Sequence, residues 1–383
     1  MMSQTSARST HIPVLDHLRG VAAFLVFAVH FNSLLPSEVV GEQVHQLTTY
    51  GIYGVEMFFA ITGFVIPYSM YLRGHTLQHS GTFLLRRIAR LEPPYLVCIA
   101  LIVCLNAITN WRVGAGALHP ELQVSAGQLL AHIGYLNAIL GFRWLNVVFW
   151  TLAIEFQFYL ACLVAFPLVF SRHAAVRVIS LISIAALGFL GTGIRDQNPP
   201  LLPYWLPLFA MGLTTCCAFT RQLDKPIAVI VMSIVVLIAL AVNGVASTLF
   251  AAIPLAAIGL MNTLHPWRVL RPVAWLGTIS YSFYLLHLPI GQRMVGHLRR
   301  HVPANVAGEC MMFGLVFTAV VGASYIFYRL IERPSQRLSQ RIGRRGALRV
   351  ETTVDGSVIA PALSMNEVAP SRVGALEENA GIA

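Results

Sequence analysis

Charged residues are scarce in this sequence. Only 11% of its 383 residues are Asp, Glu, Lys or Arg, while 56% are hydrophobic and the mean hydropathy is +0.69. A soluble domain averages about 25% charged residues. The shortage excludes an ordinary soluble domain and predicts an all-α, polytopic integral membrane protein.

Lysine is almost absent. Lys225 is the only lysine, so nearly all of the positive charge behind the net charge of +10 comes from arginine. The arginines lie between apolar segments and do not form one continuous basic stretch. This distribution is typical of membrane topology, and it indicates no nucleic-acid partner.

Paired cysteine motifs and a cleavable signal are also lacking. The six cysteines lie inside apolar segments and none forms a CxxC pair, so the sequence predicts neither a disulfide framework nor a metal site. Residues 1–13 are polar, and the apolar stretch after them is too long for the hydrophobic region of a signal peptide. We expect this first apolar stretch to remain in the mature protein.

What the sequence does contain is a series of about ten apolar segments, each of roughly 20 residues and long enough to cross a bilayer. They are 14–35, 51–72, 93–110, 146–170, 175–194, 200–219, 226–243, 246–263, 273–296 and 306–330. If the spans alternate in direction, most arginines gather in the loops on one side. The positive-inside rule then places both termini in the cytoplasm, with Arg299 and Arg300 as the exception.

These spans predict one transmembrane domain over residues 14–340. A cytoplasmic N-terminal segment, residues 1–13, precedes it, and a flexible cytoplasmic tail without apolar periodicity, residues 341–383, follows it. Residues 111–145 form the longest external segment. Part of this segment is weakly amphipathic, which is compatible with a position at the membrane interface or with packing back into the protein.

The first span, VLDHLRGVAAFLVFAVHFNSLL, carries Asp16, Arg19 and His30. Ionisable groups inside a membrane are unfavourable, so each is a candidate functional residue. Arg19 and His30 are eleven positions apart, and in a helix they would share a face about 16 Å apart along the axis. For Asp16, a local ion pair with Arg19 is an equally good interpretation.

Other spans place polar side chains on single helical faces, and these residues are candidates to line a site. They are Glu56 in the second span, Glu155 and Tyr159 in the fourth, and Ser280, Tyr284 and His287 in the ninth. An imidazole and a carboxylate at one depth can act as an acid–base pair. We therefore expect Glu155 to orient His30, while His287 is equally well explained by a structural hydrogen bond.

Arg86, Arg87 and Arg90 precede the third span, in FLLRRIARLEPPY. A membrane anchor on the cytoplasmic side would explain them. A phosphate clamp would explain them equally well, because guanidinium groups match phosphate oxygens in geometry and charge.

Together these segments resemble acyltransferase family 3, the polytopic acyl-CoA-dependent O-acyltransferases. Arg19 and His30 match its Arg-x10-His signature. GVEMFFAITGFVI is similar to its Gly-Val-Asp-x-Phe-Phe-x-x-Ser-Gly-Phe segment, with Glu56 in place of Asp and Thr62 in place of Ser. RRIARLEPPY, WTLAIEFQFYL, ISYSFYLLHLPI and LIERPSQR resemble further family motifs. The resemblance covers about residues 12–340.

The resemblance implies an O-acyltransferase of the bacterial cytoplasmic (inner) membrane. Its donor would be cytoplasmic acyl-CoA, commonly acetyl-CoA, with no permanently bound cofactor. Its acceptor would be a hydroxyl of a carbohydrate or lipid-linked glycan. The resemblance further implies that His30 is catalytic, that Arg19 is its essential partner, and that Arg86, Arg87 and Arg90 contact the coenzyme.

The sequence leaves some alternatives open. Transfer could be direct or could pass through an acyl group on His30. A polytopic transporter or flippase of a lipid-linked or small polar substrate would also place polar residues inside the membrane. The arginine cluster, combined with a histidine on the Arg19 face, favours the enzyme. The external loops 36–50 and 111–145 carry no motif that identifies the acceptor.

Overall fold

The computed structural model describes residues 12–35, 37–113, 123–193, 201–260, 270–303 and 305–343. Every regular element in these ranges is helical. By its contacts the chain divides into two units, residues 1–342 and 343–383, and the helices described here belong to the first. Nearly all of the predicted N-terminal segment 1–13 and tail 341–383 lies outside the described residues.

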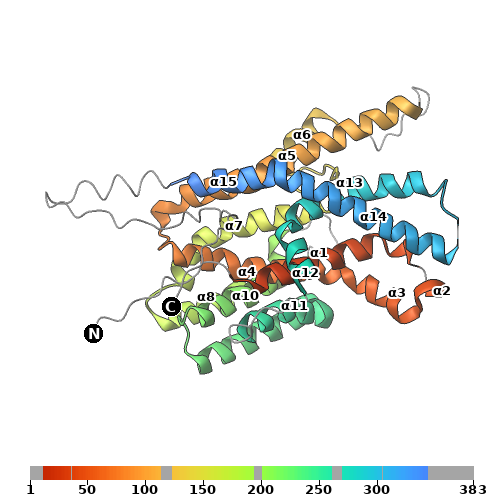
Figure 1. The fold of residues 1–383 in the computed structure, drawn as a ribbon. Helices are drawn as coiled ribbons and strands as arrows, with labels where there is room; N and C mark the ends of the chain where they lie inside the picture. Colours follow the sequence, from red (N-terminus) through yellow and green to blue (C-terminus); the bar gives the residue numbers. More distant parts are fainter. Residues whose placement is uncertain are drawn as a thin grey trace, which may run out of the picture. The chain divides into compact units, whose positions relative to one another are not determined.

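Long helices occupy the predicted spans (Figure 1). Those that occupy one predicted span each are α1 (Val14–His30), α4 (Gly54–Leu72), α5 (Ser80–Val113), α7 (Phe149–Val169), α10 (Leu202–Phe219) and α14 (Val306–Phe327). α11 (Lys225–Leu260) is kinked and covers two predicted spans. Two spans are divided, into α8 (Ala174–Ala186) with α9 (Gly188–Thr192), and into α12 (Arg271–Thr278) with α13 (Ser280–Leu298). The short elements are η1 (Asn32–Leu34), α2 (Ser37–Val40), α3 (Glu42–Thr49), η2 (Tyr50–Tyr53), η3 (Leu77–His79), α6 (Ala126–Ile133), the π-helical turn η7 (Tyr328–Glu332) and α15 (Arg333–Arg341).

The described residues contain seven helices that are long and apolar enough to cross a membrane, or eight if α12 and α13, bent by 79°, form one span. The two predicted spans within α11 meet at a kink, because Gly244 has non-helical torsion angles (φ 84°, ψ 174°) that glycine adopts readily. α1 has 17 residues, slightly fewer than a span of about 20. The all-α prediction is confirmed, while the count of about ten spans and the cytoplasmic termini stay predictions.

The apolar core has two parts. One packs α4, α7, α8, α10 and α11 together and includes the stacked rings of Phe158 and Phe209, whose centroids lie 4.1 Å apart. The other packs α1, α5, α13 and α14 together and includes Phe27 and Phe283, whose centroids lie 5.6 Å apart. Both parts contribute side chains to the site described below.

Glycine allows α4 and α10 to approach closely. Gly63 on α4 faces the backbone of Phe209, and Gly212 on α10 faces the backbone of Ala60. A methyl group at either glycine would overlap a carbonyl oxygen of the other helix. Small residues are the usual means of close helix contact in membranes, where apolar burial alone does not favour one helix over lipid.

α1 and α12 meet in the same way. Gly20 faces the carbonyl of Val273, and Gly277 faces the backbone of Asp16. The sharp bend between α12 and α13 lets α12 cross α1 while α13 runs along it, as Figure 1 shows. The contact fixes the first turns of α1, which carry Asp16 and Arg19.

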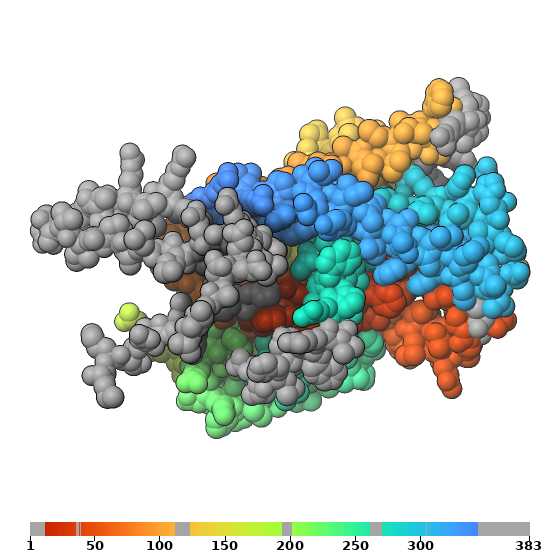
Figure 2. Space-filling model, viewed as in Figure 1, coloured from red at the N-terminus to blue at the C-terminus, as the bar shows by residue number. Residues whose placement is uncertain are grey.

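The helix that starts at α14 continues through η7 into α15, and α15 lies along α5 (Figures 1 and 2). Two hydrogen bonds join them. Arg86 Nε donates to the Ile342 carbonyl (2.8 Å), and Ser339 Oγ donates to the Arg86 carbonyl (2.8 Å).

The amphipathic part of the external segment packs back into the protein, which was one of the two predicted positions. The Tyr135 ring stacks against Tyr95 of α5 and Phe156 of α7, with centroid distances of 4.9 and 5.2 Å. His132 of α6 is fully buried. Its Nδ1 donates to the Gln128 carbonyl (2.8 Å), and its Nε2 accepts from the Leu145 N–H (3.1 Å), so the neutral ring ties this segment together.

We expect Gly63→Ala to lower the free energy of unfolding by about 1–3 kcal/mol, because the added methyl group overpacks the α4–α10 contact. Gly314→Ala on α14 is the matched control. A methyl group there meets nothing within 4 Å, and alanine is the better helix former by up to about 1 kcal/mol. Thermal unfolding of detergent-purified protein, followed by circular dichroism, measures both changes. Equal melting temperatures for the two variants would contradict the packing described here.

The folded protein should also lose stability as the pH falls below about 6.5. Burial lowers the pKa of His132. As the pH falls, His132 is therefore protonated in the unfolded chain while it is still neutral in the folded protein, and this favours unfolding. His132→Gln removes this titration, so the melting temperature of the variant should change less between about pH 7 and pH 5 than that of the wild type. Identical slopes would show that His132 does not titrate in this way.

Candidate active site

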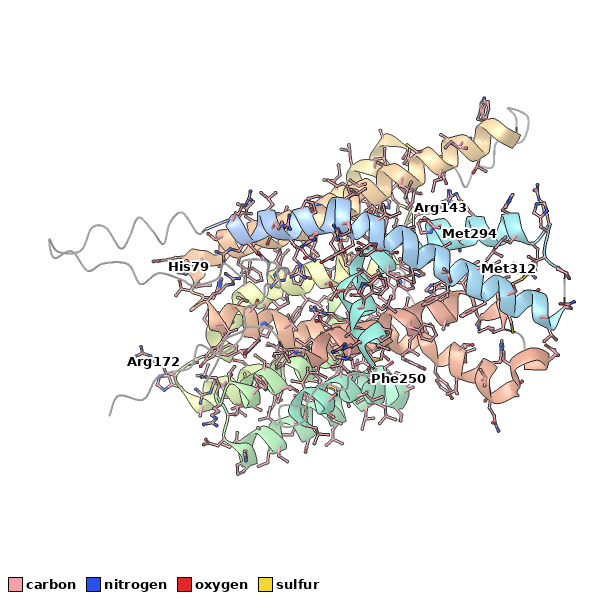
Figure 3. All side chains as sticks on the ribbon, in the orientation of Figure 1. His79, Arg143, Arg172, Phe250, Met294 and Met312 are labelled. Carbon is pink, nitrogen blue, oxygen red and sulfur yellow. The ribbon has the colours of Figure 1, made fainter. Side chains whose placement is uncertain are left out.

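Side chains fill most of the space between the helices (Figure 3), and a cavity of about 310 Å³ remains where α1, α4, α5, α7, α12 and α13 meet η7 and α15. Its volume is at the lower end of the range for small-molecule sites, roughly 300–1,000 Å³. The cavity is lined by three guanidinium groups and three carboxyl groups. These belong to Arg19, Arg87 and Arg90, and to Asp16, Glu155 and Glu332.

The cavity brings most of the predicted site residues together. Those that line it are Asp16, Arg19, Arg87, Arg90, Glu155, Tyr159, Ser280 and Tyr284. Those that do not line it are His30, Glu56, Arg86 and His287. The helical faces predicted from sequence spacing therefore converge on one site for α1, α5, α7 and the start of α13.

Glu155 is held by two hydroxyl groups. Its Oε1 accepts from Thr62 Oγ1 of α4 (3.1 Å), and its Oε2 accepts from the Tyr159 hydroxyl one turn later on α7 (3.1 Å). Arg19 lies within electrostatic range of this carboxyl group. Thr62 lines the cavity but was not predicted as a site residue, although it occupies a position in a recognised motif.

The three arginines of α5 have different surroundings. Arg87 Nη2 donates to Ser69 Oγ (2.9 Å), and its guanidinium lies over the rings of Phe83 (5.4 Å) and Tyr159 (5.8 Å). Arg90, three positions later, shares this face and lines the cavity. Arg86 points toward α15 and is used in the α5–α15 contact.

Glu332 is a cavity residue that sequence reasoning missed. Its Oε2 accepts from both the N–H (3.1 Å) and the hydroxyl (2.5 Å) of Ser282, and its Oε1 accepts from Gln336 Nε2 (2.9 Å). It is 4% exposed and lies in the π turn η7, a deviation that is frequent at functional sites. The available signal was a carboxyl group at the end of an apolar span, in LIERPSQR.

His30 lies at the C-terminal end of α1, and its side chain is exposed. Its Nδ1 is 2.7 Å from the Val26 carbonyl. Because a carbonyl only accepts, Nδ1 carries the proton and Nε2 carries the lone pair of the neutral ring. The predicted pairing with Glu155 does not occur among the described residues, since the hydrogen bonds of Glu155 go to Thr62 and Tyr159.

His287 of α13 is the histidine that lies beside His30. The ring centroids are 5.1 Å apart, with the rings at 65° to one another. One turn earlier on α13, Tyr284 lines the cavity, and its hydroxyl is 2.6 Å from Thr151 Oγ1. Tyr284 therefore lines the cavity and also contacts His287, with 5.7 Å between the ring centroids.

Glu56 has a different position from the one predicted for a site-lining residue. It is 6% exposed, and its Oε1 accepts from Ser247 Oγ of α11 (3.2 Å). This carboxyl group belongs to the α4–α11 contact.

A bundle of apolar helices with charged side chains around one cavity and an exposed imidazole nearby has the features of a membrane enzyme. Comparison with known proteins also indicates a membrane enzyme. The sequence model of acyltransferase family 3, described as "Acyltransferase domain", matches residues 12–329, so the chain belongs to this family.

Several curated proteins are similar over most of the chain. Acyltransferase MdmB of Streptomyces mycarofaciens is 26% identical over 385 residues, which cover 88% of this chain and 94% of that protein. Peptidoglycan O-acetyltransferase OatA of Listeria monocytogenes is 27% identical over 341 residues, or 76% of this chain and 51% of that protein. O-acetyltransferase OatA of Staphylococcus aureus is 24% identical over 372 residues, or 85% and 57%.

The chain thus spans nearly the whole of MdmB and little more than half of the OatA proteins. No solved structure gives a significant match. The predicted enzyme class is confirmed: the protein is a membrane O-acyltransferase.

We expect Glu332→Gln to lower the free energy of unfolding by about 1–3 kcal/mol, because the amide offers one acceptor oxygen where the carboxyl group receives donors on both. Thermal unfolding in detergent measures the loss. Glu38→Gln, at an exposed position on α2, is the control and should leave the melting temperature unchanged. A variant as stable as the wild type would mean that the hydrogen bonds of Glu332 do not hold η7 against α13.

Proposed function

We propose that this protein transfers an acyl group, most simply acetyl, from cytoplasmic acyl-CoA to a hydroxyl of a carbohydrate or lipid-linked glycan in the bacterial cytoplasmic membrane. One observation carries the proposal. Arg87 and Arg90 line a cavity that Tyr284 also lines, and Tyr284 contacts His287, the neighbour of the exposed imidazole of His30. The names of the OatA relatives, which are O-acetyltransferases and in one case act on peptidoglycan, support an acetyl group and a glycan acceptor.

The donor half of the proposal rests on the arginines. Guanidinium groups bind phosphate oxygens through paired, charge-assisted hydrogen bonds. Arg87 and Arg90 would hold the phosphates of the coenzyme at the cavity. Arg19 begins the stretch of α1 that ends at His30, a rise of about 16 Å. A pantetheine arm of comparable length would bring the thioester toward His30.

The carboxyl and hydroxyl groups of the cavity suit the arm of the donor. The pantetheine arm contains two amides, whose N–H groups need acceptors when they leave water. Glu155, fixed by Thr62 and Tyr159, offers carboxylate oxygens at the wall of the cavity. In this assignment Glu155 is a donor-binding residue and does not orient His30.

The chemical step assigned to His30 is the deprotonation of the acceptor. Its Nε2 lone pair takes the hydroxyl proton, and the oxygen attacks the thioester carbonyl. The bond from carbon to sulfur then breaks, and the thiolate leaves and takes up the proton from His30. General base catalysis of this kind contributes about 10²–10⁴-fold to a rate. Because His30 is exposed, the acceptor can approach it from outside the donor cavity.

The test of the donor site is acetyl-CoA binding by detergent-purified protein, measured by calorimetry. Arg87→Ala should weaken binding about 10- to 100-fold, because charge-assisted hydrogen bonds to phosphate are lost. Arg86→Ala is the matched control, since this arginine bonds to Ile342 and not to the cavity, and it should bind within about twofold of the wild type.

In the same preparation, His30→Ala should retain binding and lose slow hydrolysis of the thioester. Wild-type protein that does not bind acetyl-CoA would overturn the proposed donor. Loss of binding in His30→Ala would overturn the role of His30 as the base.

A further inference from the structure

The two neighbouring imidazoles have the same protonation pattern. In His30 and in His287, Nδ1 lies 2.7 Å from a backbone carbonyl, that of Val26 and of Tyr284 respectively. A carbonyl can only accept a hydrogen bond, so each Nδ1 carries a proton. In the neutral pair, both Nε2 atoms therefore carry lone pairs.

The Nε2 lone pair of His287 has no hydrogen-bond partner in the part of the chain that the structure describes. This side chain is 1% exposed, and its Nε2 makes no hydrogen bond with the described residues. Buried polar atoms are nearly always hydrogen-bonded, so the exception requires an explanation. The neighbouring ring of His30 cannot supply the missing donor while it is neutral, because two lone pairs repel each other.

Protonation of His30 changes this situation. When His30 Nε2 takes the proton of the acceptor hydroxyl, its ring becomes a cation, and the neutral ring of His287 with its unpartnered Nε2 lone pair lies beside it. The attraction between this lone pair and the positive charge exists only in the protonated state. An interaction made in the transition state and absent from the ground state lowers the barrier and raises the rate.

We infer that His287 is a positioning residue whose neutral ring, with its unpartnered Nε2 lone pair, stabilises the positive charge of the protonated imidazole of His30 during acyl transfer. The inference rests on the proposed function, and it gives His287 the part that the sequence had suggested for Glu155. The proton moves from the acceptor hydroxyl to His30 Nε2, and it passes to the thiolate sulfur when the carbon–sulfur bond breaks. His287 ends the cycle neutral, as it began.

The position of His287 fits this part. It lies between His30, on the accessible side where the acceptor arrives, and Tyr284, the cavity residue on the donor side. The ring of Phe283 lies nearly parallel to that of His287, at 13°. Aromatic and aliphatic neighbours exclude water, so no solvent molecule would compete for the lone pair.

The experiment compares three replacements of His287 by steady-state kinetics with acetyl-CoA in detergent-purified, full-length protein. Glutamine places a polar atom at the position of Nε2, asparagine places one at the position of Nδ1, and phenylalanine fills the space without an acceptor. We expect His287→Phe and His287→Asn to lower kcat about 100-fold with KM for acetyl-CoA unchanged. His287→Gln should stay within about tenfold of the wild type.

Ser324→Ala on α14 is the control, because Ser324 is another fully buried polar side chain without a described partner. Its kcat should equal that of the wild type. If His287→Phe does not fold, the comparison of glutamine with asparagine still decides the question.

Equal losses in the glutamine and asparagine variants, or a loss that appears in KM, would overturn the role of His287 while leaving the proposed function in place. A wild-type protein that neither binds nor turns over acetyl-CoA would instead overturn the proposed function, and the inference with it.

Discussion

The structure depends on mutual neutralisation of charge inside an apolar bundle. A single ion in a hydrocarbon environment is strongly unfavourable, so each guanidinium and each carboxyl group at the cavity needs groups of opposite sign or hydrogen-bond partners nearby. Three arginines and three carboxylic residues meet this requirement around one space. Hydroxyl groups from α4, α7 and α13 complete it by bonding to Glu155 and Glu332.

The same need to surround the charged groups of the cavity explains the close contacts between the helices that line it. α12 must cross α1 tightly for the first turns of α1 to face the cavity, and two glycines permit this crossing. The α4–α10 contact, also built on glycine, brings Thr62 toward α7. The apolar core packs against these helices on either side of the cavity.

The sequence predicted the helices well and the site in part. Runs of apolar residues located every long helix, and the spacing of Arg19, Glu155 and Tyr159 predicted faces that do converge. Spacing along one helix does not show how two helices are rotated toward each other. His30 and Glu155 were matched by their depth alone, and the structure separates them because α7 turns Glu155 toward α4.

Two other residues show the same limit. Arg86 was grouped with Arg87 by adjacency, yet neighbours on a helix point about 100° apart, and α15 draws Arg86 away. Glu332 was not predicted as a site residue, because its partner Ser282 is fifty positions away in the sequence and local patterns do not report contacts over that separation. Short-range periodicity therefore predicted the elements, and long-range contacts decided which of their side chains meet.

The π turn at Tyr328–Glu332 has a consequence for how this protein can change over evolution. A π turn is in effect one extra residue accommodated within a continuous helix, and it rotates everything beyond it by about 100°. Ser339 therefore faces the Arg86 carbonyl only because of that additional residue. Loss of a single codon between positions 328 and 332 would leave the sequence of α15 unchanged. It would rotate α15 so that the residues that now contact α5 no longer face it. A substitution in this part of the chain changes one side chain, whereas a change in length would alter the cavity and the α5–α15 contact together.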